Sequence, residues 1–222
     1  MVFEPPVEIA GRRTVFTVID GRVALRFALT DTVRPESREV VAALAGEGLE
    51  RTMLLTGDHE LAAASVAATV GVSHYKAACL PEQKLDEVRA LKRQGLRVLV
   101  VGDGVNDAPA LAGGHLGVAI NHSAGHIAVQ TADVALLQDN LHGLVSFVRV
   151  SHRAMRLINQ NLLVSTLIIV GALLLTSLGL VGPLGAALLH ETSAFFVLLN
   201  SSRLLRFQGQ GARAGELRGD RP

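Results

Sequence analysis

Residues 98–111 read VLVVGDGVNDAPAL and hold the most informative pattern in the chain. Val98–Val101 is a run of β-forming residues, which predicts a short buried strand. The loop after it contains Asp103 and Asp107, with glycines that let a ligand approach the backbone closely. These two carboxylates and Asn106 offer hard oxygen ligands, which suit Mg²⁺ rather than zinc. The loop therefore predicts a magnesium site that screens phosphate charge during phosphoryl transfer.

Short apolar strands and helices alternate on both sides of this loop. Apolar strands separated by helices indicate an α/β fold, a parallel sheet covered on both faces. Upstream, β-rich runs at 13–19 and 22–29 flank Asp20-Gly21, which predicts a hairpin. We expect further strands over 52–55, 98–101, 116–120 and 134–137, and helices over 34–45, 60–70 and 81–94.

A second loop carries groups suited to phosphate. In a parallel sheet, ligands bind at the carboxyl ends of the strands, which directs attention to the residues after the strand at 52–55. There, Thr56 offers a hydroxyl and Gly57 a backbone N–H to phosphate oxygens, and Asp58 is placed to cap the following helix. Lys84, at the start of another helix, offers a compact positive charge to the same phosphate.

The end of the chain is apolar enough to enter a membrane. Residues 157–189 contain no Lys, Arg, Asp or Glu. As a helix, Leu162–Val181 would reach about 30 Å, the thickness of a bilayer's hydrocarbon core. Gly182-Pro183 predicts a turn before a second apolar stretch at 184–202, and arginines flank this hairpin but not its turn, so both ends should lie in the cytoplasm. The alternative, a hairpin buried in a large soluble protein, would require more enclosing chain than the residues before it provide.

The composition excludes several classes of protein. The 222 residues are 49% hydrophobic and 18% charged, which rules out a disordered chain. A net charge of +1, the absence of Trp and the single Tyr argue against nucleic acid as a partner. The one cysteine, Cys79, excludes an internal disulfide and a Cys-only zinc site, and we expect it to be a small core residue.

Several motifs follow one another along the chain in a recognisable order. They are DTVRPE at 31–36, MLLTGD at 53–58, LPEQK at 80–84, VGDGVNDAPAL at 101–111 and TADV at 131–134. With the apolar hairpin, they resemble the C-terminal portion of a heavy-metal-transporting P-type ATPase, whose phosphorylation domain has the haloacid-dehalogenase fold. The resemblance implies the end of a nucleotide-binding domain (1–28), an incomplete Rossmann-like phosphorylation domain (29–145), a transmembrane hairpin (146–207) and a disordered tail (208–222).

The resemblance also implies roles for the loop residues. Thr56 and Lys84 would hold the phosphoryl group, and Asp103 would bind Mg²⁺. Asn106 and Asp107 would supply the surrounding hydrogen bonds.

Cofactors, partners and location follow from the same resemblance. Asp58, Asp31 and Arg34 would lie near the hinge to the nucleotide-binding domain, with Gly57 beside the bound nucleotide. Mg²⁺ and ATP would serve the complete pump, which carries a divalent transition metal across the plasma (inner) membrane as a multi-pass protein. The expected partners are the membrane and the N-terminal portion of the pump.

One part of the catalytic machinery is missing from the sequence. The family's nucleophile is an aspartate in an Asp-Lys-Thr-Gly-Thr motif, and no such motif occurs here. We therefore expect this chain alone not to form an aspartyl phosphate. The alternatives are a non-enzymatic regulatory or structural membrane protein, or a membrane-anchored phosphatase of the same fold, which would require an Asp-x-Asp nucleophile that is also absent.

Two ionisable residues interrupt the second apolar stretch. Ionisable side chains such as those of His190 and Glu191 are costly to place inside a bilayer, so these two residues are candidates for binding the transported metal. The alternative is that the pair packs the helices together. Some metal-pump subgroups carry a His-Glu-Gly-Gly motif, but this chain reads His-Glu-Thr-Ser. His122 and His126 have the spacing of a metal pair, but they fall in an expected loop without a third ligand.

Overall fold

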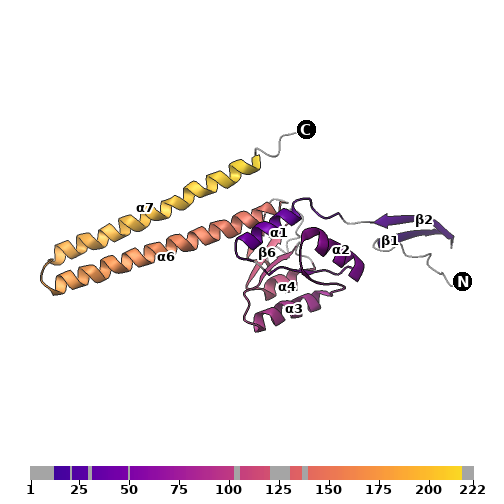
Figure 1. Cartoon of the computed structure of the whole chain (residues 1–222), viewed down its shortest axis with the longest axis horizontal. Helices are drawn as coiled ribbons and strands as arrows, with labels where there is room; N and C mark the ends of the chain where they lie inside the picture. Colours follow the sequence, from indigo (N-terminus) through magenta and orange to yellow (C-terminus); the bar gives the residue numbers. More distant parts are fainter. Residues whose placement is uncertain are drawn as a thin grey trace. The chain divides into compact units, whose positions relative to one another are not determined.

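The computed structural model describes residues 13–20, 22–29, 32–49, 51–102, 106–120, 131–136 and 140–216. The chain divides into two compact units, Met1–Val145 and Ser146–Pro222. Strands and short helices make up the first unit, and two long helices make up most of the second (Figure 1).

The N-terminal strands form an antiparallel hairpin. β1 (Arg13–Ile19) pairs with β2 (Arg22–Leu29), which confirms the predicted strands. The register shifts at a bulge between Thr17 and Val18. At the turn, Asp20 has a φ of 49°, a left-handed conformation that Asp tolerates better than most residues do.

Parallel strands organise the rest of the first unit. β3 (Met53–Leu55) pairs with β4 (His74–Lys76), and β5 (Leu99–Gly102), β6 (Leu116–Ile120) and β7 (Val134–Leu136) form a three-stranded sheet in that order. All of these pairings are parallel, which confirms the predicted α/β fold. The sequence did not predict β4, because its end residues are polar and exposed and the run is too short to show alternation.

Among the described residues of this unit, the strands are accompanied by α1 (Ser37–Gly46), α2 (Glu60–Val70), α3 (Pro81–Arg93) and α4 (Ala108–Gly113), which Figure 1 labels. The first three were predicted to within a few residues. The short α4 was not, because a proline and a glycine within so few residues favour a loop.

The start of α2 differs from the prediction. His59, not Asp58, occupies the N-cap position, and its Nδ1 accepts a hydrogen bond of 3.2 Å from the backbone N–H of Ala62. The Asp58 carboxylate instead accepts a hydrogen bond from the Thr56 hydroxyl. The predicted capping role of Asp58 was therefore wrong, because the carboxylate turns back toward the preceding loop.

The core of this unit lies where α3 and α4 pack beside β6. Its most completely buried large side chains are Val88, Leu111 and Val118, one from each of these elements. Lys92 on α3 ties the two helices together, since its Nζ donates to the carbonyl oxygens of Gly113 and Gly114 at 2.8 and 3.0 Å. These contacts hold the C-terminal end of α4 against α3.

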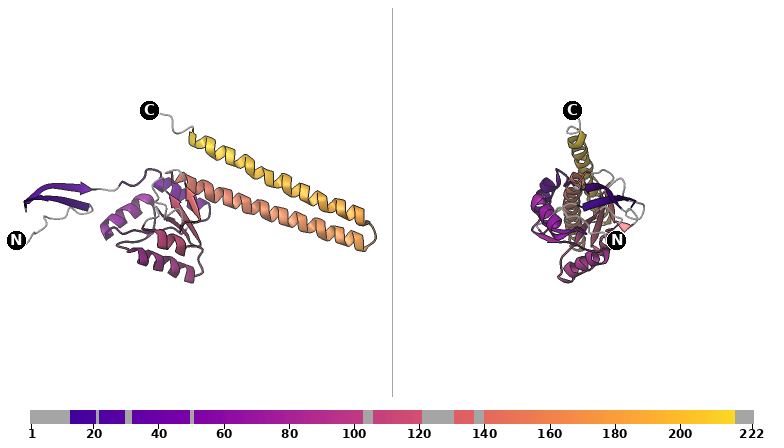
Figure 2. Two further views of the ribbon diagram at one scale, coloured as in Figure 1. Left: turned by 180° about the vertical axis from the view of Figure 1, so that it is seen from behind. Right: turned by 90° about the vertical axis from the view of Figure 1, so that its right-hand side faces the viewer.

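The second unit is a pair of antiparallel helices, α6 (His142–Ser177) and α7 (Pro183–Glu216), which run side by side (Figure 2). α7 begins at Pro183, which confirms the predicted turn at Gly182-Pro183. Within the described residues, α6 is the one helix whose length and composition would let it cross a membrane, with a mean hydropathy of 1.9 over its most apolar stretch. Two such helices were expected, but His190-Glu191 lowers the hydropathy of α7.

The end of α7 also differs from the prediction. A disordered tail was expected from residue 208, whereas the helix continues to Glu216. Extending an existing helix adds a hydrogen bond for each residue without the cost of a new nucleus, which outweighs the glycines in this segment. Residues 217–222 lie outside the described residues.

Candidate functional site

Lys84 and Asp107 form an ion pair at the end of β5. The Lys84 Nζ donates to the Asp107 Oδ1 at 2.7 Å, and the two side chains are only 15% and 22% exposed. Lys84 lies in the first turn of α3, where its backbone N–H donates to the Leu80 carbonyl. Asp107 is the residue that precedes α4. The fold thus brings together two of the predicted site residues from separate helices.

Gly102 leaves the space that the Asp107 side chain occupies. A Cβ at residue 102 would lie 2.7 Å from both Cβ and Oδ2 of Asp107, closer than real Cβ atoms approach their neighbours. Only glycine therefore fits at the last position of β5 while Asp107 stays in place. The sequence singled out this loop for its glycines, but the neighbour that makes Gly102 necessary appears only in the structure.

The Thr56 hydroxyl closes a turn within its own loop. Its Oγ1 donates to the Asp58 Oδ2 at 2.9 Å and accepts from the Asp58 backbone N–H at 3.1 Å. The Thr56 carbonyl accepts from the Cys79 N–H at 2.9 Å, and an added Cβ at the exposed Gly57 would lie 3.5 Å from the Cys79 oxygen. Because Cys79 lies just before α3, these contacts anchor the Thr56 loop beside the helix that carries Lys84.

The other predicted residues of the loop after β5 divide into two groups. Asn106 is exposed, so its amide is accessible to a ligand. Asp103, the predicted magnesium ligand, lies outside the described residues, as do Asp31, His122 and His126. The expected convergence of Thr56, Lys84, Asp103 and Asp107 therefore holds directly for Lys84 and Asp107, and stays a prediction for the complete set.

Two supporting residues were not assigned a role from the sequence. Asp133, in the TADV motif, accepts a hydrogen bond of 2.8 Å from the backbone N–H of Gly117 and so ties the start of β7 to β6. Lys76 on β4 forms an ion pair of 2.8 Å with Glu87. The hydrogen bond to the Glu87 carboxylate, and then its charge, raise the pKa of Lys76, which holds the ammonium group charged.

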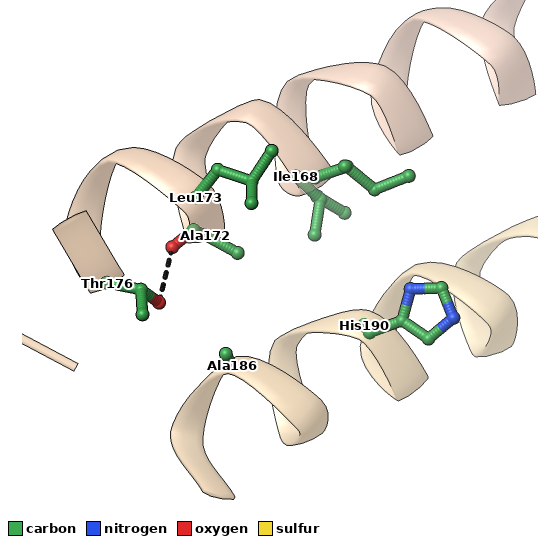
Figure 3. Close-up of a pocket in the computed structure, with 7 residues that line it drawn as sticks. Ile168, Ala172, Leu173, Thr176, Ala186 and His190 are labelled. Carbon is green, nitrogen blue, oxygen red and sulfur yellow. Dashed lines mark hydrogen bonds between the residues drawn. The ribbon is translucent and has the colours of Figure 1, made fainter. Parts of the chain in front are cut away.

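His190 and Glu191 occupy different environments on α7. His190 lines a cleft of about 240 Å³ between α6 and α7, with Ile168, Ala172 and Ala186 (Figure 3). Glu191 does not line it, because successive residues of a helix point about 100° apart. Among the described residues, no three His, Cys, Asp or Glu side chains gather as a metal cluster. The role of this pair in metal binding stays a prediction.

The parallel strands, with a lysine–aspartate ion pair at the end of β5, place this unit in the α/β class of Rossmann-like domains. Residues 3–115 match the family model of haloacid dehalogenase-like hydrolases, and the chain belongs to this family. The predicted family and fold class are thereby confirmed.

The chain is also homologous to heavy-metal-transporting P-type ATPases. It is 42% identical over 190 residues to a zinc-exporting P-type ATPase of Mycobacterium marinum, and 41% identical over the same length to a manganese-exporting P-type ATPase of Mycobacterium tuberculosis. Each match covers 86% of this chain and 26% of the relative. The crystal structure of a zinc-transporting PIB-type ATPase in the E2.Pi state superimposes with a TM-score of 0.75 at 34% identity, covering 88% of this chain and 32% of that one. The chain thus spans about a quarter of the length of these curated relatives.

Proposed function

We propose that this chain is the C-terminal part of a P-type ATPase that exports a divalent transition metal, and that its α/β unit handles the phosphoryl group. The observation that carries the proposal is the Lys84–Asp107 ion pair at the end of β5, in a fold of the haloacid dehalogenase-like family. A lysine ammonium attracts phosphate oxygens, and the aspartate keeps it in position until phosphate arrives. The homology to zinc- and manganese-exporting pumps supports the assignment of a metal cargo.

The donor groups around this pair fit Mg²⁺. The Asp107 Oδ1 is engaged by Lys84, which leaves its second carboxylate oxygen free of that ion pair, and Asn106 offers an exposed amide oxygen. Oxygen donors of this kind suit Mg²⁺, with Asp103 as the proposed additional ligand. When bound, Mg²⁺ would neutralise phosphate charge. In the complete pump, Thr56 and Lys84 would hold the phosphoryl group, and Gly57 and Asp58 would lie on the side where ATP binds.

The nucleophile in this proposal comes from another part of the pump. The 222 residues contain no Asp-Lys-Thr-Gly-Thr motif, and positive charge near phosphate cannot by itself form a covalent intermediate. We therefore assign the phosphorylated aspartate to an N-terminal portion, the proposed partner of this chain. The same assembly would be a multi-pass protein of the plasma membrane, with α6 and α7 crossing the membrane and the α/β unit in the cytoplasm.

Complementation tests this proposal. The chain would be produced together with the N-terminal portion of the M. marinum relative, up to the point where the match begins, and phosphoenzyme would be trapped with labelled ATP. We expect label only when both parts are present, and loss of label in Lys84→Gln. The matched control is Lys76→Gln, which removes the similarly short but more exposed ion pair with Glu87, whose side chains are 50% and 24% exposed.

Each outcome separates the alternatives. Phosphoenzyme on this chain alone would overturn the assignment of the nucleophile to another part. No phosphoenzyme with both parts present, in membranes where they co-purify, would instead favour a non-enzymatic membrane protein. Equal loss of label in Lys84→Gln and Lys76→Gln would remove Lys84 from the phosphate site.

A further inference from the structure

A row of polar side chains joins α6 to α7 through hydrogen bonds. We call Asn161, Ser165, Ser193, Asn200 and Ser201 the polar seam. The Asn200 Nδ2 donates to the Asn161 Oδ1 at 2.8 Å, the Asn161 Nδ2 donates to the Ser201 Oγ at 3.0 Å, and the Ser193 Oγ donates to the Ser165 Oγ at 3.0 Å. These bonds are polar contacts between the facing sides of the two helices.

Asn200 is the best connected member of the polar seam. Its Nδ2 also approaches the Gln160 Oε1 at 3.5 Å, and its Oδ1 accepts from the Arg203 Nη1 at 3.1 Å, so both ends of the amide are used. Asn200 is only 8% exposed and Ser193 only 5%, whereas Leu198 and Leu199 on the same helix are each more than 60% exposed. Asn200 and Ser193 thus face α6, whereas Leu198 and Leu199 face outward.

His190 lies on the same face of α7 as this seam. Residues 186, 190, 193, 197 and 200 follow the three- and four-residue spacing of one helix face. Ser193 is therefore the next residue of this face after His190. Its bond to Ser165 fixes the position of His190 along the axis of α6. In this position along α6, His190 lines the cleft with Ile168 and Ala172 (Figure 3).

We propose that Asn200 is a positioning residue, which fixes the register of α7 on α6 and thereby holds His190 in the cleft. Apolar helices in lipid gain little from one register over another, since the lipid tails are as apolar as their side chains. A shift of α7 by one turn, about 5.4 Å, would separate Asn200 from Asn161 and break the hydrogen bonds that the Asn200 amide makes to α6. The register is thus set by polar groups, and the position of His190 depends on it. The consequence for metal export rests on the proposed function, whereas the register itself does not.

Disulfide cross-linking of the full chain in lipid nanodiscs tests the register. The chain has one cysteine, so Cys79→Ser gives a background in which every disulfide is an engineered one. The Oγ atoms of Ser165 and Ser193 are 3.0 Å apart, so Ser165→Cys with Ser193→Cys should cross-link readily. Pairs of Ser165→Cys with Leu189→Cys or Val197→Cys report a slip of α7 by one turn in either direction.

The proposal predicts that Asn200→Ala moves cross-linking from the 165–193 pair to a slipped pair, with a several-fold loss at 165–193. Asn161→Ala should do the same, and the double variant should lose less than the two single losses combined, because the Asn200–Asn161 bond is common to both. The matched control is Ser202→Ala, whose hydroxyl donates to the Leu199 carbonyl of its own helix. Unchanged 165–193 cross-linking in Asn200→Ala would overturn the proposal. So would loss at all three pairs, since Asn200 would then be needed for association rather than register.

A second arm connects the register to His190 in the complemented pump. Asn200→Ala should raise several-fold the metal concentration for half-maximal ATP hydrolysis, and the 165–193 disulfide should restore the original value. In a His190→Ala background, Asn200→Ala should have no further effect. An equal effect in both backgrounds would overturn the positioning role. If no pump assembles, the proposed function fails while the cross-linking arm still decides the register.

Discussion

Lys84 and Asp107 are 23 residues apart in the sequence, yet their side chains meet at 2.7 Å. The contact joins the first turn of α3 to the residue before α4, and α4 packs against both α3 and β5, the strand that ends at Gly102. The charged pair therefore exists only when these elements have assembled. This couples the electrostatics of the proposed phosphate site to the stability of the α/β unit.

The first prediction concerns the stability of this pair. Lys84→Met should lower the free energy of local opening of α3 and α4 by about 1–3 kcal/mol, because it leaves a largely buried carboxylate without its partner. Lys76→Met, which breaks the more exposed pair with Glu87, should cost less than Lys84→Met does, because solvent screens an exposed pair. Hydrogen exchange of peptides from α3 and α4, measured on the full chain in detergent, gives both values.

A double-mutant cycle decides whether this cost belongs to the pair. In an Asp107→Ala background, Lys84→Met should lower the free energy of local opening much less than it does alone, because the carboxylate that it would leave without a partner is already removed. Equal costs in both backgrounds would show that Lys84 stabilises α3 by packing rather than through Asp107.

The second prediction concerns the glycine at the end of β5. Gly102→Ala places a Cβ where Asp107 lies, so it should displace that side chain, separate it from Lys84 and destabilise the unit by about 1–3 kcal/mol. Gly46→Ala is the matched control, since an added Cβ there meets no atom within 4 Å and alanine favours a helix by up to about 1 kcal/mol. Thermal unfolding of the two variants should shift in opposite directions. An unchanged unfolding temperature in Gly102→Ala would mean that the Asp107 side chain can move aside without loss of stability.

The third prediction uses the single tyrosine of the chain. The Tyr75 hydroxyl donates to the Glu60 Oε1 at 2.9 Å, and this hydrogen bond, together with the charge of Glu60, raises the pKa of Tyr75 above its usual value of about 10. Because the folded pKa is raised, the bond stabilises the fold fully below about pH 10 and is lost as the pH rises through the folded pKa. With one Tyr and no Trp, tyrosinate absorbance of the full chain reports this group alone.

Glu60→Gln should bring the midpoint of that titration back toward the usual value, whereas Glu39→Gln on α1 should leave it unchanged. The comparison also tests the placement of β4, which carries Tyr75, beside the start of α2. A midpoint that does not respond to Glu60→Gln would show that the strand and helix are not adjacent in solution.

Some features of this fold could be predicted because neighbouring residues determine them. Val98–Val101 indicated β5 to within a residue, and Pro183 indicated the start of α7, since β-forming runs and proline act on the local backbone. The Asp107 loop was found from its glycines and carboxylates. These signals all lie within a few residues of the structure that they predict.

Other features depend on residues far apart in the chain and could not be predicted from local pattern. Nothing in the sequence around Asn161 indicates that Asn200 is its partner, and nothing around Gly102 reveals that Asp107 covers it. Asp58 has the residue type and position of a helix cap, but its carboxylate accepts a hydrogen bond from the Thr56 hydroxyl instead. Tertiary contacts outweigh local propensity at such positions.

The fourth prediction separates metal handling from phosphate chemistry in the complemented pump. His190→Ala and Glu191→Ala should each lower export of the metal, because ionisable groups at this depth are costly unless they serve a cation path. Their effects should combine independently, since His190 lines the cleft and Glu191 points about 100° away on α7. Both variants should still be phosphorylated by inorganic phosphate, the reverse of hydrolysis, whereas Lys84→Gln should lose this reaction as well.

Thr192→Ala provides the control for these substitutions, because the Thr192 hydroxyl bonds to the Leu188 carbonyl of its own helix and neither lines the cleft nor carries charge. Metal content of the producing cells, compared with phosphorylation of the purified membranes, measures the two functions separately. Unchanged export in both His190→Ala and Glu191→Ala would assign these residues to helix packing. Loss of phosphorylation in either variant would show that the substitution also impairs the α/β unit, so the loss of export could not be assigned to the cation path.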